Sequence, residues 1–284
     1  TFGAPRVTVI VPTYNWATVL PYSIGSALDQ TMGDFELLVI GDGCTDESEQ
    51  VVRGIRDRRV QWHNLRVNGK SQAGPNGLGL RLARGRLVAY LGHDDLWLPR
   101  HLERLVAALD AGATLAHGRQ LRLDPGARPY LSPGPHYRYQ RGAWLPPTSA
   151  AHVRDAARLV GGWRFPHQTG ALDPEADLWR RLHDEAGERG APVFVPALTS
   201  VKLPATLRHG VYKTRPHHEQ EAWLQRIRAA RDAETELLAA CDGPPVPDPR
   251  GPGAHVIPPE VTGEVPLDAV ARHAVRRKFK GLDD

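Results

Sequence analysis

Two adjacent carboxylates, Asp94 and Asp95, follow an apolar run at residues 87–91 that has the composition of a buried strand. A strand buried on both faces of a parallel sheet is apolar throughout, and ligands of open α/β sheets bind at the carboxyl ends of such strands. Two carboxylates this close repel each other unless they share a proton or a cation. The pair therefore suits a hard divalent ion, Mn²⁺ or Mg²⁺, that also binds a diphosphate. The alternative is that one Asp caps a helix starting near Pro99.

The amino-acid composition limits which classes of protein this chain can belong to. The 284 residues carry a formal net charge of +4 without a clustered basic stripe, which argues against a nucleic-acid partner. Cys44 and Cys241 form neither a disulfide framework nor a zinc pattern, and the thirteen His residues show no metal-ligand spacing. No apolar run approaches the ~20 residues of a transmembrane span, and no secretory signal opens the chain. We therefore expect a soluble cytoplasmic protein, and the abundance of Arg, Ala, Gly and Pro indicates a bacterial source.

Strand-like runs alternate with helix-like segments in the first part of the chain. The runs at 6–11, 35–40 and 60–63 have the composition of strands, and helices are predicted at 16–30 and 47–56. This alternation is typical of βαβ units. It predicts an α/β fold that is Rossmann-like, with a mostly parallel central sheet and helices on both faces.

Polar segments follow three of the predicted strands, at residues 13–15, 42–46 and 94–95. Because βαβ crossovers are right-handed, the carboxyl ends of the parallel strands open on one edge of the sheet, and the three segments converge there. Glycines on both sides of Asp42 let the backbone approach a ligand closely. We therefore predict a nucleotide site at this edge; a turn or cap role is the alternative for Asp42.

Three motifs in this region resemble the leading motifs of the family 2 glycosyltransferases of GT-A fold. They are Val-Ile-Val-Pro-Thr-Tyr-Asn at 9–15, Glu-Leu-Leu-Val-Ile-Gly-Asp-Gly-Cys-Thr-Asp at 36–46, and Val-Ala-Tyr-Leu-Gly-His-Asp-Asp-Leu-Trp-Leu-Pro at 88–99. Their order and spacing match from about residue 5 to 110, and a weaker likeness continues to about residue 230. The resemblance implies an inverting hexosyltransferase that moves a sugar from a nucleoside diphosphate donor to an acceptor hydroxyl or amine.

The resemblance also implies roles for donor-binding residues. The residues that would line the nucleoside pocket are Pro12, Thr13, Tyr14 and Asn15. Asp42 would accept a hydrogen bond from the imide N–H of uracil or thymine, which favours a UDP- or dTDP-sugar. Asp94 would contact the ribose or the sugar. Asp95, the last acid of an Asp-X-Asp-like motif, would hold Mn²⁺ or Mg²⁺ on the diphosphate, with Asp94 as a second ligand.

The first acidic position of the family's metal-binding motif is lost in this chain. Family members commonly read Asp-Asp-Asp-Asp or Asp-Ala-Asp-Asp where this chain has Gly92-His93-Asp94-Asp95. Fewer carboxylates predict a modest affinity for the metal, or a role for His93 as a metal ligand or as a hydrogen-bond donor to phosphate.

A second departure removes a donor-binding cation. The loop after the third strand parallels the family's Gly-X-Ser-X-Ala-Arg-Asn-X-Gly element, but Pro75 stands where an Arg is usual. Lys70, or Arg81 a turn later, is the expected replacement as a charge for phosphate. Asn76 is expected to cap a helix that starts at Gly77 and to leave N–H groups facing the cleft.

Residues 173–182 resemble the Glu-Asp-X-Asp-Leu-Trp-Leu-Arg-Leu element in which family members carry the catalytic base. Direct overlay puts Glu175 on the base position and Asp177 on the following acid, with Asp173 as the third candidate. Inversion in one step needs a carboxylate that takes the acceptor's proton while the nucleophile attacks opposite the departing diphosphate. The alternatives are a helix cap for Asp173 and an exposed or salt-bridged position for Asp177.

Two further segments are interpreted as covers of the cleft. Residues 125–147 predict a hairpin or an irregular loop that faces a carbohydrate or natural-product acceptor, or that only packs over the site. A later polar stretch holds the cations Lys202, Arg208, His209 and Lys213. In the family this region often folds over the diphosphate, so Arg208 is a candidate donor-binding residue, with plain surface charge as the alternative. The Gln-X-X-Arg-Trp element of the family's processive synthases is absent, which favours transfer of a single sugar.

The expected domain organisation is one GT-A domain with a helical C-terminal extension. The GT-A domain would span residues 1–215, with a nucleotide-sugar-binding half at 1–110 and an acceptor and catalytic half at 111–215. Residues 216–243 predict one long packing helix, from His217 to Ala240, that offers a possible homodimer contact. The remainder, 244–284, is interpreted as a Pro- and Gly-rich tail with a short basic helix whose end is solvated or touches anionic lipid or a partner.

Two other classes of protein remain as alternatives. A sugar-phosphate nucleotidyltransferase needs a Gly-rich loop with Lys or Arg directly after the first strand, where this chain has Pro-Thr-Tyr-Asn. A catalytically silent nucleotide-sugar-binding module would keep Asp42 and dispense with the acids, so Asp95 and Glu175 argue against it.

Overall fold

Four strands, three of them largely apolar, form the parallel half of the central sheet. β1 (Val7–Thr13), β2 (Phe35–Gly41) and β4 (Leu87–Tyr90) are buried along almost their whole length, and β3 (Val60–Asn64) lies at the edge. Strands that are apolar on both faces need cover on both faces, and the flanking helices supply it. The structure is a computed structural model that describes residues 3–134, 136–187, 192–246 and 257–283.

The second half of the sheet mixes strand directions. β8 (Ala150–Val153) runs antiparallel to β4, and β6 (Leu115–Arg122) lies between β8 and β9 (Val193–Lys202). β5 (Leu96–Trp97) pairs with β9 and β7 (Tyr130–Ser132) pairs with β6, giving the order β3-β2-β1-β4-β8-β6-β9-β5. The expected α/β fold is confirmed.

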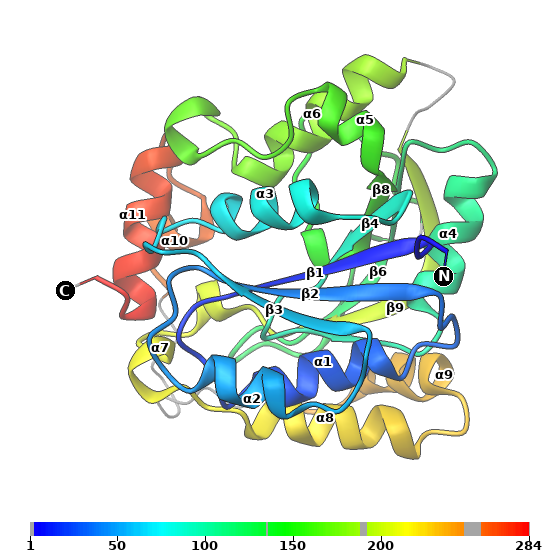
Figure 1. The fold of residues 1–284 in the computed structure, drawn as a ribbon. Helices are drawn as coiled ribbons and strands as arrows, with labels where there is room; N and C mark the ends of the chain where they lie inside the picture. Colours follow the sequence, from blue (N-terminus) through cyan, green and yellow to red (C-terminus); the bar gives the residue numbers. More distant parts are fainter. Residues whose placement is uncertain (1–2, 135, 188–191, 247–256, 284) are drawn as a thin grey trace.

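Helices cover both faces of the sheet (Figure 1). One face carries α3 (Ala73–Leu82), α5 (Arg154–Leu159) and α6 (Pro174–Ala186). The other face carries α1 (Leu20–Leu28), α2 (Ser48–Gly54), α4 (His101–Asp110), α8 (His218–Ala229) and α9 (Ala233–Leu238). The parallel strands are therefore fixed as a rigid layer, and their carboxyl ends are the edge left for a site.

The C-terminal helices stand at the carboxyl ends of the parallel strands. α7 (Val211–Thr214), α10 (Pro259–Thr262) and α11 (Ala269–Lys280) lie together at that edge (Figure 1). The basic end of α11 is solvated only in part, because its Arg277 is 7% exposed whereas Lys278 is exposed. Of the predicted tail at 244–284, residues 247–256 lie outside the described residues.

One element prediction is corrected. The single helix expected from His217 to Ala240 is two helices, because the chain turns after Ala229 and Asp232 caps α9 by accepting hydrogen bonds from two backbone N–H groups. β9 is one continuous strand that runs through Pro196. Pro196 is tolerated there because the pairing of β9 with β6 shifts register at that point, so no ladder N–H is needed.

The described residues contain no helix that is both long and apolar enough to cross a lipid bilayer.

The close approach of α3 to β1 requires a glycine at position 79. A Cβ at Gly79 would lie 2.7 Å from Cγ2 of Ile10, whereas one at Gly77, on the same helix, would meet nothing nearer than 3.7 Å. We therefore expect Gly79→Ala to lower the free energy of unfolding by about 1–3 kcal/mol. The matched variant Gly77→Ala gains helix propensity and is expected to be neutral or stabilised by up to about 1 kcal/mol. Urea denaturation checks this, and equal stability of the two variants would contradict the tight packing.

Candidate active site

A cleft of about 590 Å³ opens at the carboxyl edge of the parallel strands and is large enough for a small ligand. The sequence-predicted residues that line it are Pro12, Thr13, Tyr14, Asp42, Lys70, Asn76, His93, Asp94, Asp173 and Glu175. The predicted residues that do not line it are Asn15, Arg81, Asp95, Asp177, Arg208, His209 and Lys213. The cleft therefore joins the strand ends of the first half of the chain to the start of α6.

Asp42 marks one end of the cleft, directly after β2. Its backbone N–H donates to the carbonyl of Thr13, 2.8 Å away, and its Oδ1 accepts a hydrogen bond of 2.9 Å from the N–H of Gly69. Burial raises the pKa of the Asp42 carboxyl, and the Gly69 N–H opposes that rise. A buried carboxylate that lines the cleft is suited to accept a hydrogen bond from a ligand N–H.

Asn15 holds two loops together instead of lining the cleft. It adopts a positive φ of 43°, and its Oδ1 accepts hydrogen bonds from the N–H groups of Thr45, at 2.7 Å, and Asp46, at 3.3 Å. Asn is one of the residues that tolerate this backbone conformation. The predicted donor-binding role of Asn15 is therefore replaced by a positioning role.

Asn76 lies inside α3 rather than at its start. The helix begins at Ala73, so the prediction that Asn76 caps it is wrong. The Asn76 side chain is fully buried beside the cleft, and neither its oxygen nor its nitrogen has a hydrogen-bond partner among the described residues. Buried amides without partners are rare, so this one suits a polar ligand group.

The two adjacent carboxylates have different surroundings. Asp95 is fully buried; its Oδ2 accepts hydrogen bonds from Thr148 Oγ1 at 2.5 Å and Lys202 Nζ at 2.7 Å, and its Oδ1 accepts one from the N–H of Leu203 at 3.0 Å. Asp94 lines the cleft, and only its Oδ2 is engaged, by the N–H of Ala205 at 3.0 Å. Burial would raise the pKa of Asp94, but the ammonium of Lys202 and hydrogen bonds such as that from the N–H of Ala205 together outweigh burial, so the pKa lies below its ordinary value.

A divalent ion finds only one protein oxygen in this arrangement. Both oxygens of Asp95 are already used, whereas Oδ1 of Asp94 accepts no hydrogen bond from the described residues. Mg²⁺ often binds through one carboxylate, with phosphate oxygens and water completing its shell, so Asp94 alone fits such an ion. The role of Asp95 as the principal metal ligand does not fit these contacts.

His93 is not available to phosphate without losing an internal hydrogen bond. Its Nδ1 bonds with Thr13 Oγ1 at 2.8 Å and its Nε2 with the Tyr212 hydroxyl at 3.1 Å. Burial lowers the pKa of His93 to about 4, so the ring is neutral at pH 7. The expectation that it binds the metal or the phosphate is therefore corrected: it fixes the loop after β4 against Thr13 and Tyr212.

Glu175 lies in the first turn of α6 with its carboxylate in the cleft. Oε1 accepts a hydrogen bond of 2.7 Å from Trp144 Nε1, and Oε2 accepts one of 2.9 Å from Gln72 Nε2. Burial raises the pKa of Glu175 to about 7, and the negative charge of Asp173 adds to that rise. A carboxyl with this pKa can take or give a proton near neutral pH. Trp144 and Gln72 were not among the predicted site residues, since neither belongs to a recognisable motif.

The two acids beside Glu175 are both engaged in ion pairs. Asp177 is 1% exposed and pairs with Arg180 and Arg181, each at 2.9 Å, so it is the salt-bridged helix residue of the alternative interpretation. Asp173 lines the cleft and pairs with Arg272 and Arg276 of α11, each at 3.1 Å. Neither acid therefore has a carboxylate free to act as a base.

α11 contributes four cations and one histidine to the cleft, none of which a sequence motif had assigned to a site. Its residues that line the cleft are Arg272, His273, Arg276, Arg277 and Lys280. Their spacing at intervals of one, three and four residues puts them on one face of the helix, and that periodicity is the signal that could have identified the face. Like charges at this spacing repel, so the face needs acidic partners in the fold.

Arg208 lies outside the cleft. It is 4% exposed and pairs with Glu219 at 2.9 Å, and it donates hydrogen bonds to the carbonyls of Pro204 and Leu123. Its predicted role as the donor-binding cation of a lid is therefore wrong. Lys202, from the same predicted lid, does line the cleft.

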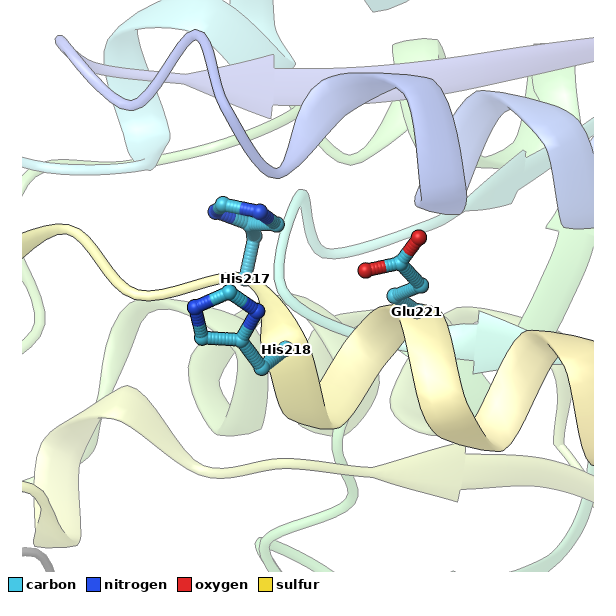
Figure 2. Close-up of side chains that lie close together, drawn as sticks. All are labelled: His217, His218 and Glu221. Carbon is cyan, nitrogen blue, oxygen red and sulfur yellow. The ribbon is translucent and has the colours of Figure 1, made fainter.

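A second group of possible metal ligands lies apart from the cleft. Ligand atoms of His217, His218 and Glu221 all lie within 4.8 Å of one another at the start of α8 (Figure 2). This corrects the expectation that the His residues show no metal-ligand spacing. The His217 ring is stacked on Tyr22 of α1, with ring centroids 5.8 Å apart. The cluster has no residue in common with the cleft lining.

The known proteins that this chain is similar to are glycosyltransferases. The family described as glycosyl transferase family 2 matches residues 8–157. An uncharacterized glycosyltransferase of Rickettsia felis is 33% identical over 254 residues, which cover 84% of this chain and 41% of that protein. The UDP-Glc:alpha-D-GlcNAc-diphosphoundecaprenol beta-1,3-glucosyltransferase WfgD of Escherichia coli is 34% identical over 105 residues, covering 36% of this chain and 40% of that protein. The matched segments thus span less than half the length of either relative.

A solved structure supports the fold. The mannosyltransferase PcManGT from Pyrobaculum calidifontis, in complex with GDP-Man and Mn²⁺, superimposes with a TM-score of 0.56 at 16% identity. The likeness covers 99% of this chain and 88% of that one. The fold is therefore GT-A.

The hydrogen bond from Trp144 stabilises the ionised form of Glu175. We expect Trp144→Phe, which keeps an aromatic ring but removes the indole N–H, to raise the pKa of Glu175 by up to about one unit. The side-chain carboxyl ¹³C shift of Glu175, followed by NMR across pH 5–9 in both proteins, measures this change. An unchanged or lower pKa in the variant would contradict the assigned contact.

Proposed function

This chain belongs to glycosyl transferase family 2, and on that basis we propose that it transfers a single sugar from a nucleoside diphosphate sugar to an acceptor hydroxyl or amine, with inversion. The observation that carries the proposal is the position of Glu175. Its carboxylate has a pKa raised to about 7 by burial, and it lies in the same cleft as Asp42 and Asp94. A base and two candidate donor contacts in one cavity are what a direct displacement requires.

The donor is proposed to enter with its base at Asp42 and its sugar toward Glu175. The carboxylate of Asp42 accepts the imide N–H of uracil or thymine, so a UDP- or dTDP-sugar is favoured. The name of the E. coli relative, which includes UDP-Glc, supports a uridine donor. Asn76 offers its unpartnered amide to the same ligand, and Asp94 faces the ribose or the sugar.

Glu175 acts as the base in a single displacement. The acceptor oxygen or nitrogen attacks the anomeric carbon, its proton passes to a carboxylate oxygen of Glu175, and the bond from that carbon to the diphosphate breaks with the electron pair leaving on the diphosphate. Because the attack and the departure are on opposite faces, the configuration inverts and no second carboxylate is needed as a nucleophile. A divalent ion, Mn²⁺ or Mg²⁺, held by Asp94 and the diphosphate would supply charge to the leaving group.

Trp144 is proposed to contact the acceptor. It lies in the loop between β7 and β8, is 44% exposed, and donates its indole N–H to Glu175. Sugars and other ring-shaped acceptors stack on exposed aromatic faces, and a ring next to the base would place the attacking hydroxyl there. A carbohydrate or a natural product is therefore the acceptor class.

Glu175→Gln is expected to separate catalysis from donor binding. The amide keeps the size of the side chain but cannot accept the proton, so the rate of transfer should fall by about 10²–10⁴-fold. The dissociation constant of the donor, measured by calorimetry, should change less than about twofold because the nucleotide contacts are untouched.

Glu185→Gln is the matched control, since Glu185 is an exposed acid on the same helix. Its transfer rate should equal that of the unmodified protein. Most of the turnover surviving in Glu175→Gln would refute the assignment of the base. Loss of donor binding in that variant would assign Glu175 to the donor pocket instead.

A further inference from the structure

Lys280, the last residue of α11, stands out among the cations of the cleft. Arg272 and Arg276 pair with Asp173, and Arg277 pairs with Asp283 at 2.7 Å. The Lys280 ammonium lies 5.6 Å from the centroid of the Tyr212 ring, and the described residues provide no carboxylate in ion-pair contact with it. A cation that faces a cavity without a carboxylate in direct contact is suited to bind an anion there.

The other cations of the cleft act on Lys280 through their charge. Burial lowers its pKa to about 8; Asp94 opposes that shift, and Arg277, Arg276 and Lys202 add to it. Repulsion between neighbouring cations is relieved when an anion binds among them. Lys280 shares the cleft with Asp94, which follows β4, and with Lys202, which ends β9. This is the part of the cleft where we expect the diphosphate of a donor to bind.

The position of Lys280 is fixed by contacts along the whole of α11. Asp268 caps the helix by accepting a hydrogen bond of 2.8 Å from the N–H of Ala271, and the two Arg–Asp173 pairs tie its middle to α6. At its end, the Phe279 carbonyl accepts a hydrogen bond of 2.8 Å from the N–H of Gly210. The ammonium is therefore presented to the cleft by a docked helix, as a preorganised site requires.

We propose that Lys280, with Lys202 beside it, binds the diphosphate of the donor, so that α11 completes the donor site from the far end of the chain. This inference rests on the proposed function. It accounts for two features of this chain together. Pro75 stands where the family usually has a donor-binding Arg, and both oxygens of Asp95 are occupied by Lys202 and its other hydrogen-bond partners. Side-chain cations then carry most of the charge that binds the diphosphate, and donor binding persists without a divalent ion.

The test compares Lys280→Met with Lys278→Met, using UDP as the ligand in the presence of EDTA. Lys278 is an exposed cation on the same helix that does not line the cleft, so it is the matched control. A charge-assisted hydrogen bond of typical strength corresponds to a loss of about 10- to 100-fold in affinity. Calorimetry should show that loss in Lys280→Met and none in Lys278→Met. Binding of uridine, which has no phosphate, followed by ligand-observed NMR, should be the same in all three proteins.

A structural role for Lys280 predicts a different pattern. Lys280→Arg keeps the charge and is expected to bind UDP more tightly than Lys280→Gln, whereas loss of a merely packed side chain would weaken uridine and UDP alike. Equal UDP affinity in the unmodified protein and in Lys280→Met would overturn the inference and leave the proposed function intact. Binding of UDP by the unmodified protein only when Mn²⁺ is added would also overturn it. Failure to bind UDP, dTDP or GDP under any condition would overturn the proposed function itself.

Discussion

Ion pairs between carboxylates and cations at the carboxyl edge of the sheet organise the cleft. Asp95 forms an ion pair with Lys202 at the end of β9, and Asp173 forms ion pairs with Arg272 and Arg276 of α11. An unpaired charge in such a place is strongly destabilising, so each acid fixes the segment that neutralises it. The C-terminal helix is thereby held at the site, and the start of α6 is held against it.

Ion pairs also explain why Glu175 differs from its neighbours. It receives hydrogen bonds from two neutral groups, Trp144 and Gln72, whereas both nearby acids have arginine partners. Without a cation in contact, burial raises its pKa to about 7, where it exchanges a proton readily. The ion pairs of Asp173 and Asp177 therefore leave one carboxylate of the three for chemistry, and the orientation of α6 follows from the other two.

The sequence predicts the parts of the molecule that depend on local pattern. The apolar runs of β1, β2 and β4 are buried strands, and the positions of Asp42 and Asp94 follow from where β2 and β4 end. Glu175 follows from its motif. What the pattern does not contain is long-range pairing, such as that of Asp173 with Arg272, 99 residues away. From sequence alone, a charged helix after a Pro-rich stretch is predicted to be a solvated tail, because its acidic partners are distant in the chain. Asp95 is likewise predicted to be a metal ligand, because the sequence does not show that Lys202 lies beside it.

The central claim is that one cleft holds the donor between Asp42 and α11 and turns its anomeric carbon toward Glu175. A crystal structure of the protein with a bound UDP-sugar tests this most directly. The account predicts the uracil N–H on the Asp42 carboxylate, the diphosphate within hydrogen-bond distance of Lys280, and the anomeric carbon on the side of the cleft that faces Glu175. A donor bound outside this cleft, or one whose anomeric carbon faces away from Glu175, would contradict it.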